Sequence, residues 1–424
     1  MVHPRPPTRP RILYVQPCSS FGGAERQASL SVPRLTSLGF DVLPLVGPGD
    51  TIVSWLQENG VDDLVLSADF PGGWPRPRGL ARMSLLGRYW RCLRRVRAET
   101  ERLVRSRRID LIFAAMPFSW LATTRVARKA GIPVIWRAGG TEAGLVSRTV
   151  LSAWATLRPP DLLVCCGDAV QRMYGPLVRS PSVVIANGVD TDTFRPGAGD
   201  ARRFRPADAQ VVIGFAGRLV PQKRPEDIIR TAARIAARHP DAVFLIAGDG
   251  SRRAAYAELA RSLNVERQVR FLGYVADMQS FYAACDIFVL PSRAEGCPNV
   301  VLESMAMRRA VIVSDAPGTR EVITDGRNGL VYRVGDLDAL ASAATRLIEQ
   351  PDLRRALIDR AHQRVHSAFS TQANTRRLAD VMGAAIDLGT AARRLPVPHP
   401  QPVPAEWAGA AGDGAGVAEG GGRG

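Results

Sequence analysis

Two cations follow an apolar run in the second half of the chain. Arg218 and Lys223 stand five residues apart in GFAGRLVPQKRPE. Arginine binds a phosphate through its forked guanidinium and lysine through its point charge, so the pair suits a diphosphate. Two solvated loop charges would give the same spacing. The position after an apolar strand favours the phosphate site, because open α/β sheets bind ligands at the carboxyl ends of their strands.

Two glutamates form the strongest candidate constellation. Glu295 and Glu303 lie eight residues apart in SRAEGCPNVVLESMA, after the apolar run DIFVLPS. Pro298 and Asn299 mark the entry to a helix that carries Glu303 in its early turns. Carboxylates accept hydrogen bonds from sugar hydroxyls, and a helix start offers amides to an anion. A chance pair of glutamates is common, whereas Glu-Gly-x-Pro-Asn at a strand-to-helix junction is not.

A glycine pair follows the first apolar run. Gly22 and Gly23 stand in SFGGAERQ, between that run and a helical pattern. Glycines here let the backbone approach a phosphate at the helix start, although most strand–helix turns contain glycine for conformational reasons alone. The segment is not a GxGxxG fingerprint, and no Walker lysine follows it.

Apolar runs alternate with helical patterns along the chain, in two series. Runs that are apolar on both faces predict parallel strands covered by helices on each side. The sequence therefore predicts an α/β protein with two Rossmann-like domains, residues 11–200 and 206–370, followed by a helix over 371–388. The first series is RILYVQP, DVLPLVG, DLIFAAM, IPVIWRA, DLLVCCG and SVVIANG, and the second is VVIGFAGRL, AVFLIAGDG, VRFLGYV, DIFVLPS, AVIVSDA and GLVYRVG.

The two ends differ in composition from the rest. Residues 1–10 are rich in proline and arginine, and residues 395–424 are rich in proline, glycine and alanine. Such sequence buries too little apolar surface to offset its ordering entropy, so we expect two disordered tails.

The bulk composition indicates an ordinary globular protein. The 424 residues are 46% hydrophobic and 23% charged. We find neither a secretory signal nor the ~18 uncharged apolar residues of a membrane span, so we expect a cytoplasmic protein. Its six cysteines form no CxxC pair and its five histidines form no cluster, which favours reduced thiols and no metal site.

The net charge of +16 is unusual. It predicts attraction to anions, although an arginine-rich composition is also typical of a GC-rich genome. Residues 76–108 carry twelve arginines and two glutamates, with apolar side chains at helical spacing. This pattern predicts a basic amphipathic helix, which suits either an anionic membrane surface or an ordinary helix with an arginine-rich outer face. The apolar residues are Leu80, Met83, Leu86, Tyr89, Trp90, Leu93, Val96 and Leu103.

The order of these motifs resembles that of the retaining glycosyltransferase family 4, which has the GT-B fold and a Glu-x7-Glu signature. The resemblance covers residues 11–388 and rests on an ordered set of motifs. They are the GGAER turn, ANGVDTDTFRP, the GRL…K pair, AGDG, FLGYV, the two glutamates and SDAPGTREVI.

The resemblance implies a role for each motif. Arg218 and Lys223 would bind the donor diphosphate and stabilise the leaving nucleotide, since fixed cations accelerate a step in which that charge develops. Glu295 would contact hydroxyls of the transferred sugar and Glu303 the ribose. The family usually needs no bound metal or cofactor, and its last helix crosses back to the first domain. The other donor-binding residues so implied are Gly22, Gly23, Gly217, Tyr274, Val275, Gly296, Cys297, Pro298, Asn299 and Val300.

The expected function is transfer of a hexosyl-type sugar, with retention, from a UDP- or GDP-activated donor to a hydroxyl in polysaccharide or glycolipid assembly. Many relatives carry a histidine where this chain has WRAGGTE, near Gly139, which leaves the acceptor side in doubt. We expect a sugar or lipid-linked acceptor and a peripheral position on the cytoplasmic membrane face. A sugar-nucleotide epimerase and a non-catalytic interaction protein remain as alternatives. A nucleic-acid-binding protein is disfavoured, because no such module is recognisable.

Overall fold

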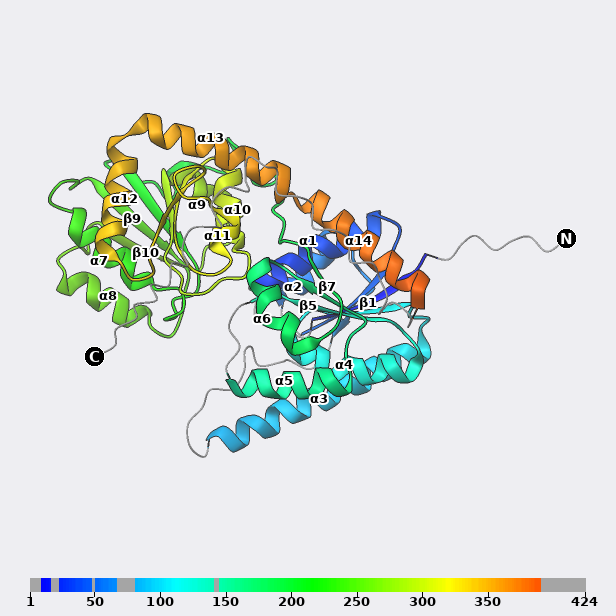
Figure 1. Ribbon diagram of the computed structural model, residues 1–424. Coiled ribbons are helices and arrows are strands. Elements are labelled where there is room, and N and C mark those ends of the chain that lie inside the picture. The colour runs from blue at the N-terminus through cyan, green and yellow to red at the C-terminus, as the bar shows by residue number, and fades with distance from the viewer. Residues whose placement is uncertain (1–8, 17–22, 48–49, 67–80, 141–144, 390–424) are drawn as a thin grey trace, which may run out of the picture.

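The computed structural model describes residues 9–16, 23–47, 50–66, 81–140 and 145–389. The described chain forms two α/β domains that lie beside each other, each built on one parallel sheet (Figure 1). The predicted fold class is confirmed. The sheets take their strands from residues 11–184 and 211–332, so the boundary predicted from the linker composition falls between them.

The N-terminal sheet has seven parallel strands in the order β3-β2-β1-β4-β5-β6-β7. Its strand order reverses between β1 and β4, the kind of position where open α/β sheets bind ligands. Sequence reasoning missed only the edge strand β3. The strands are β1 (Arg11–Gln16), β2 (Asp41–Val46), β3 (Val65–Leu66), β4 (Leu111–Ala114), β5 (Val134–Ala138), β6 (Leu162–Cys165) and β7 (Ser182–Val184).

Helices cover both faces of this sheet because its strands are apolar on both sides. In β1, Leu13 and Val15 pack into one core cluster, whereas Ile12 and Tyr14 pack into another. Successive side chains of a strand point to opposite faces, so within this domain the two clusters form the layers on either side of the sheet. The helices are α1 (Gly23–Ser37), α2 (Asp50–Glu58), α3 (Ala81–Ser106), α4 (Pro117–Ala130), α5 (Leu145–Leu157) and α6 (Asp168–Val178).

The C-terminal sheet has six parallel strands in the order β10-β9-β8-β11-β12-β13, with its reversal between β8 and β11. The strands are β8 (Val211–Ala216), β9 (Ala242–Ala247), β10 (Val269–Gly273), β11 (Ile287–Leu290), β12 (Ala310–Ser314) and β13 (Leu330–Tyr332). Its helices are α7 (Pro225–Ile235), α8 (Arg253–Ser262), α9 (Met278–Ala284), α10 (Asn299–Ala306), α11 (Thr319–Val322), α12 (Leu337–Glu349) and α13 (Pro351–Ala368).

The chain passes between the domains twice, at adjacent points. The Val189 amide donates to the Phe369 carbonyl at 2.8 Å, and the Thr371 amide donates back to the Val189 carbonyl at 3.0 Å. The last helix, α14 (Thr371–Leu388), starts there, with the Ser370 hydroxyl capping its first turn. It then crosses the N-terminal domain, as Figure 1 shows, and buries Leu378 and Met382 in the core cluster beneath α1.

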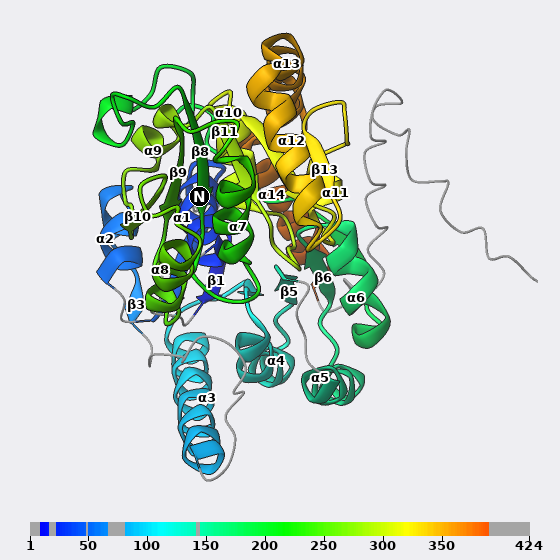
Figure 2. The same cartoon turned by 90° about the vertical axis from the view of Figure 1, so that its left-hand side faces the viewer.

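The predicted basic helix is α3, which begins at Ala81; residues 76–80 lie outside the described residues. It forms the outer edge of the N-terminal domain in both views (Figures 1 and 2). Tyr89, Val96 and Leu103 are buried against the domain, as their spacing predicts. Trp90 is an exception: helical geometry turns it away from that face, and it is 62% exposed.

Candidate active site

The two loops at the reversal point of the C-terminal sheet bring Lys223 and Glu295 together. Lys223 follows β8 and Glu295 follows β11, and these strands are neighbours in the sheet. Lys223 Nζ donates to Glu295 Oε1 at 2.6 Å, and the side chains are only 17% and 10% exposed. Arg218 lies on the same loop as Lys223 and is exposed to solvent. The structure therefore places two cations and a carboxylate at one sheet edge.

Two glycines let this edge pack tightly. Gly248 has φ +133°, and a Cβ on it would overlap the Gly217 carbonyl oxygen. Gly318 has φ +81°, and a Cβ on it would lie only 2.6 Å from the carbonyl oxygen of Glu295. Positive φ favours glycine, and neither site has room for a side chain. The loops after β8 and β11 are thus supported directly by backbone of the segments that follow β9 and β12.

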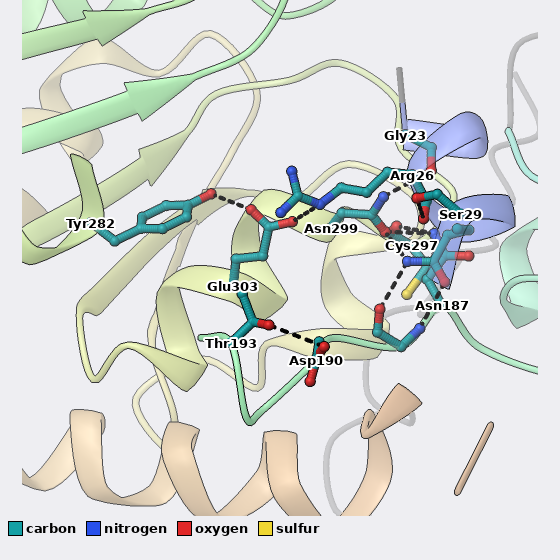
Figure 3. A network of polar contacts seen from close by, with 12 residues as sticks. Gly23, Arg26, Ser29, Asn187, Asp190, Thr193, Tyr282, Cys297, Asn299 and Glu303 are labelled. Atoms are coloured by element: carbon teal, nitrogen blue, oxygen red, sulfur yellow. Dashed lines mark hydrogen bonds and ion pairs between the residues drawn. The ribbon is translucent and has the colours of Figure 1, made fainter. Parts of the chain in front are cut away.

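Helix α10 begins beside these loops, with Pro298 in the extended N-cap position and Asn299 as its first residue. Glu303 lies in its early turns, as predicted, and its side chain is buried. Figure 3 shows both of its oxygens engaged: Oε2 accepts from the Tyr282 hydroxyl at 2.9 Å, and Oε1 pairs with Arg26 Nε at 2.8 Å. Arg26 comes from α1 of the other domain.

The protonation of Glu303 reflects these opposing influences. Burial raises the pKa of the Glu303 carboxyl above its ordinary value, whereas the Arg26 charge and the Tyr282 hydrogen bond lower it. Burial also raises the pKa of Tyr282, with the Glu303 charge as a further cause, so this phenol remains a hydrogen-bond donor.

Asn299 joins the two domains through several hydrogen bonds. Its Nδ2 donates to the Gly23 carbonyl at 2.9 Å. Its Oδ1 accepts from Gln27 Nε2 at 3.1 Å and from Asn187 Nδ2 at 2.9 Å. The Asn187 amide also donates to the Cys297 carbonyl at 2.8 Å. The start of α10 is therefore fixed by α1 and by the segment after β7 (Figure 3).

The backbone at Gly296 touches the N-terminal domain. A Cβ on Gly296 would overlap the Gly139 carbonyl oxygen and lie 2.8 Å from Cys166 Sγ. Gly139, in the WRAGGTE segment, thus faces the loop that carries Glu295.

Glu321 forms a second link between the domains. Its carboxylate accepts from the Asp168 amide at 2.7 Å and the Ala169 amide at 2.6 Å, at the start of α6. A carboxylate is favoured at a helix N-terminus because unpaired amides and the helix dipole meet there. Burial raises the pKa of Glu321, and the two amide hydrogen bonds lower it.

Solved structures share this two-domain arrangement. A structure of Anabaena HepE in complex with UDP-glucose covers 88% of this chain and 99% of its own, with a TM-score of 0.74 at 20% identity. Sucrose-phosphate synthase from Thermosynechococcus elongatus covers 89% of this chain and 100% of its own, with a TM-score of 0.74 at 19% identity. At such identities the likeness shows the fold.

Two family models divide the chain between them. The model described as Glycosyltransferase Family 4 matches residues 21–193, and the one described as Glycosyl transferases group 1 matches residues 200–364. The first model matches the N-terminal domain and the second matches the C-terminal domain, and the boundary between the two matches lies between the two sheets. The chain belongs to the GT-B glycosyltransferases.

Curated relatives of this GT-B glycosyltransferase match over part of their length. The lipopolysaccharide core biosynthesis glycosyltransferase LpsE of Rhizobium meliloti is 33% identical over 51% of this chain and 63% of its own length. A GDP-mannose-dependent monoacylated phosphatidylinositol monomannoside mannosyltransferase of Corynebacterium glutamicum is 29% identical over 66% of this chain and 78% of its own length.

The other predicted donor-site residues of the GT-B glycosyltransferase fall into three groups. Cys297 and Pro298 are buried at the start of α10, next to Val300, which is partly buried. Tyr274 lies away from them, after the edge strand β10; it is 67% exposed, and Val275 packs on the core. Gly23 is at the domain interface, whereas Gly22 lies outside the described residues.

Sequence reasoning missed several residues that contact the site or join the two domains. Arg26 and Gln27 stand within the SFGGAERQ motif, and Asn187 is the second residue of ANGVDTDTFRP, so both motifs contained residues that could have indicated these contacts. Glu321 likewise lies in SDAPGTREVI. Tyr282 belongs to no motif; only its position four residues before DIFVLPS, on the helix leading into that strand, could have indicated it.

Neither a metal cluster nor a membrane span emerges from the part of the chain that the structure describes. No three histidine, cysteine, aspartate or glutamate side chains gather there as a metal would require. None of the described helices has the length and hydropathy to cross a bilayer.

Proposed function

We propose that this protein transfers a sugar from a nucleotide-activated donor to a hydroxyl acceptor, in polysaccharide or glycolipid assembly. The observation that carries the proposal is the gathering of Lys223, Arg218 and Glu295 at the reversal point of the C-terminal sheet, beside the start of α10. Fixed cations next to helix amides suit a diphosphate, and buried carboxylates suit sugar hydroxyls.

The donor is a UDP- or GDP-sugar under this proposal. Structures of the similar HepE are described as complexes with UDP and UDP-glucose, and the similar corynebacterial enzyme is described as GDP-mannose-dependent. Arg218 and Lys223 hold the diphosphate, Glu295 binds the transferred sugar and Glu303 binds the ribose. The amides at Cys297 and Asn299 face the phosphates, and Tyr274 lies near the base.

The reaction retains the configuration at the anomeric carbon. The bond between that carbon and the diphosphate oxygen breaks, and its electron pair leaves with the nucleotide, whose charge Arg218 and Lys223 stabilise. The acceptor oxygen bonds to the same face of the sugar, and its proton passes to the departing phosphate. No protein nucleophile is required. The contacts between the domains exclude water from the reacting groups.

The acceptor binds on the N-terminal domain, and α3 holds this domain at an anionic membrane surface. The outward residues Arg88, Arg91, Arg94 and Arg95 are exposed around Trp90. Basic residues with an interfacial aromatic suit the headgroup region of an anionic bilayer. A lipid-linked acceptor would be presented there.

The test is the melting temperature of the protein with UDP-, GDP- and ADP-sugars. A donor at ~100 times its dissociation constant stabilises the folded state by about 2.7 kcal/mol. Arg218→Ala and Glu303→Gln should abolish the shift, whereas Arg230→Ala, which removes an exposed arginine from α7, should keep it. A panel without any shift, or a shift that both site variants retain, would refute the proposed donor site.

A further inference from the structure

Arg26 reaches out of its own domain to make its strongest contacts. Its Nε pairs with Glu303 Oε1 at 2.8 Å. Its guanidinium carbon lies 5.1 Å from the ring centre of Phe194, a buried residue of the segment between the domains. The aromatic ring attracts the guanidinium through a cation–π contact, and the carboxylate attracts it through a charge-assisted hydrogen bond. Figure 3 shows Arg26 extending from α1 toward Glu303.

Both carboxylate oxygens of Glu303 therefore already have partners within the protein. Tyr282 donates to Oε2 and Arg26 to Oε1. The side chain of Glu303 is only 4% exposed, so little of it is open to a ligand. Each oxygen can accept a second hydrogen bond, but the burial of this side chain leaves little room for one. A ribose hydroxyl therefore reaches the carboxylate most directly in the place of one of the two partners.

The two partners differ in how readily they can be replaced. Tyr282 is completely buried and belongs to the same domain as Glu303. Arg26 has a side chain that is 28% exposed, and it comes from the other domain on a long, flexible stem. Exchanging Arg26 leaves the core of each domain intact, whereas exchanging Tyr282 would not.

We propose that Arg26 is the protein's own stand-in for the donor ribose, which pairs with Glu303 in the donor site and is displaced when a ribose hydroxyl binds there. This inference rests on the proposed function, in which Glu303 binds the ribose. Arg26 thus acts as a positioning residue that competes with the nucleotide.

The stand-in has two consequences for binding. A ligand with ribose hydroxyls must break the Arg26–Glu303 pair, so part of its binding free energy is lost. A ligand without these hydroxyls leaves the pair in place and bears no such loss.

The experiment is calorimetric titration of the protein with UDP and GDP, each as the ribonucleotide and as its 2′,3′-dideoxy analogue. Arg26→Met removes the cation and keeps most of the stem. For the nucleotide that binds, this change should raise the preference for ribose over dideoxyribose by about tenfold, the typical worth of one charge-assisted hydrogen bond. Arg26→Lys should give a smaller increase.

Arg34→Met is the matched control. Arg34 lies on the same helix and pairs with Asp190 at 3.3 Å, away from Glu303. This variant should leave the preference unchanged. An unchanged or lower preference in Arg26→Met, with the wild type still binding nucleotide, overturns the stand-in. Failure of the wild type to bind either nucleotide overturns the proposed function instead.

Discussion

Lys223 Nζ lies 2.6 Å from Glu295 Oε1, across the reversal point of the C-terminal sheet. The pair joins a loop after β8 to a loop after β11, strands that are distant in sequence and adjacent in the sheet. The carboxylate holds the cation in place, and the donor diphosphate would compete for it.

Replacing Lys223 should therefore affect stability and activity together. Lys223→Met leaves a largely buried carboxylate without its ammonium partner, so the free energy of unfolding should fall by about 2 kcal/mol. Loss of a cation from the leaving diphosphate should slow nucleotide release about 100-fold. Urea unfolding and a coupled nucleotide-release assay measure the two effects.

The double variant Lys223→Met with Glu295→Gln separates these effects. It should recover most of the stability, because no charge is left without its partner, and none of the activity. Lys129→Met, which removes an exposed lysine from α4, should change neither quantity. Full activity in Lys223→Met would refute its role at the diphosphate.

Gly296→Ala should disturb the contact between the domains. The added methyl would overlap the Gly139 carbonyl oxygen and crowd Cys166, so the domains must separate slightly to admit it. We expect a larger radius of gyration in small-angle X-ray scattering and nucleotide affinity at least about tenfold weaker. Gly383→Ala, where an added Cβ meets nothing within 4 Å, is the control. Unchanged affinity in Gly296→Ala would show that closure does not depend on this contact.

Glu303→Gln should change how stability depends on pH. Burial raises the pKa of Glu303 above 4.5, so the folded protein binds this proton more tightly than the unfolded chain does. The stabilising effect of that proton is fully present below 4.5 and is lost as pH rises through the raised pKa. As pH rises through this range, the free energy of unfolding of the wild type should therefore fall relative to that of Glu303→Gln.

Urea titrations of both proteins at several pH values measure this difference. Glu258→Gln, on the exposed face of α8, provides the comparison, since its side chain is 63% exposed. A gap between wild type and Glu303→Gln that stays constant with pH would contradict the expected titration.

Charge reversal on α3 should weaken membrane binding. Arg91→Glu with Arg95→Glu removes two outward cations near Trp90, and each basic residue at an anionic surface contributes about 1 kcal/mol. Sedimentation with phosphatidylglycerol vesicles should show binding that falls with salt in the wild type and is nearly absent in the variant. Arg267→Glu with Arg270→Glu, two exposed sites in the C-terminal domain, should bind as the wild type does. If vesicle binding fell equally in both variants, the net charge of the protein, rather than α3, would be responsible for membrane binding.

The sequence predicted the strands well because most of them are continuous apolar runs between helical patterns. The edge strand β3, with only Val65 and Leu66, is too short to show such a pattern. The loops of Lys223 and Glu295 could be placed at strand ends, but their contact depends on β8 lying next to β11, which no local pattern encodes.

The contacts between the domains could not be predicted from the sequence, because no local pattern encodes them either. Arg26 and Glu303 are 277 residues apart and meet only because the two domains pack with α1 facing α10. The same holds for Glu321 and the start of α6. Motifs identified residue types that suit phosphate and sugar, whereas the contacts that restrain these residues follow from the packing of the domains.

The most direct test of the account is release of nucleoside diphosphate from the stabilising nucleotide sugar, measured with and without a lipid extract as a source of acceptor. We predict release that increases with the extract, accompanies incorporation of labelled sugar into lipid or polysaccharide, and falls about 100-fold in Lys223→Met. Conversion of the donor to its epimer without nucleotide release would contradict the account in favour of an epimerase. Donor binding with no turnover under any acceptor would contradict it in favour of a non-catalytic protein.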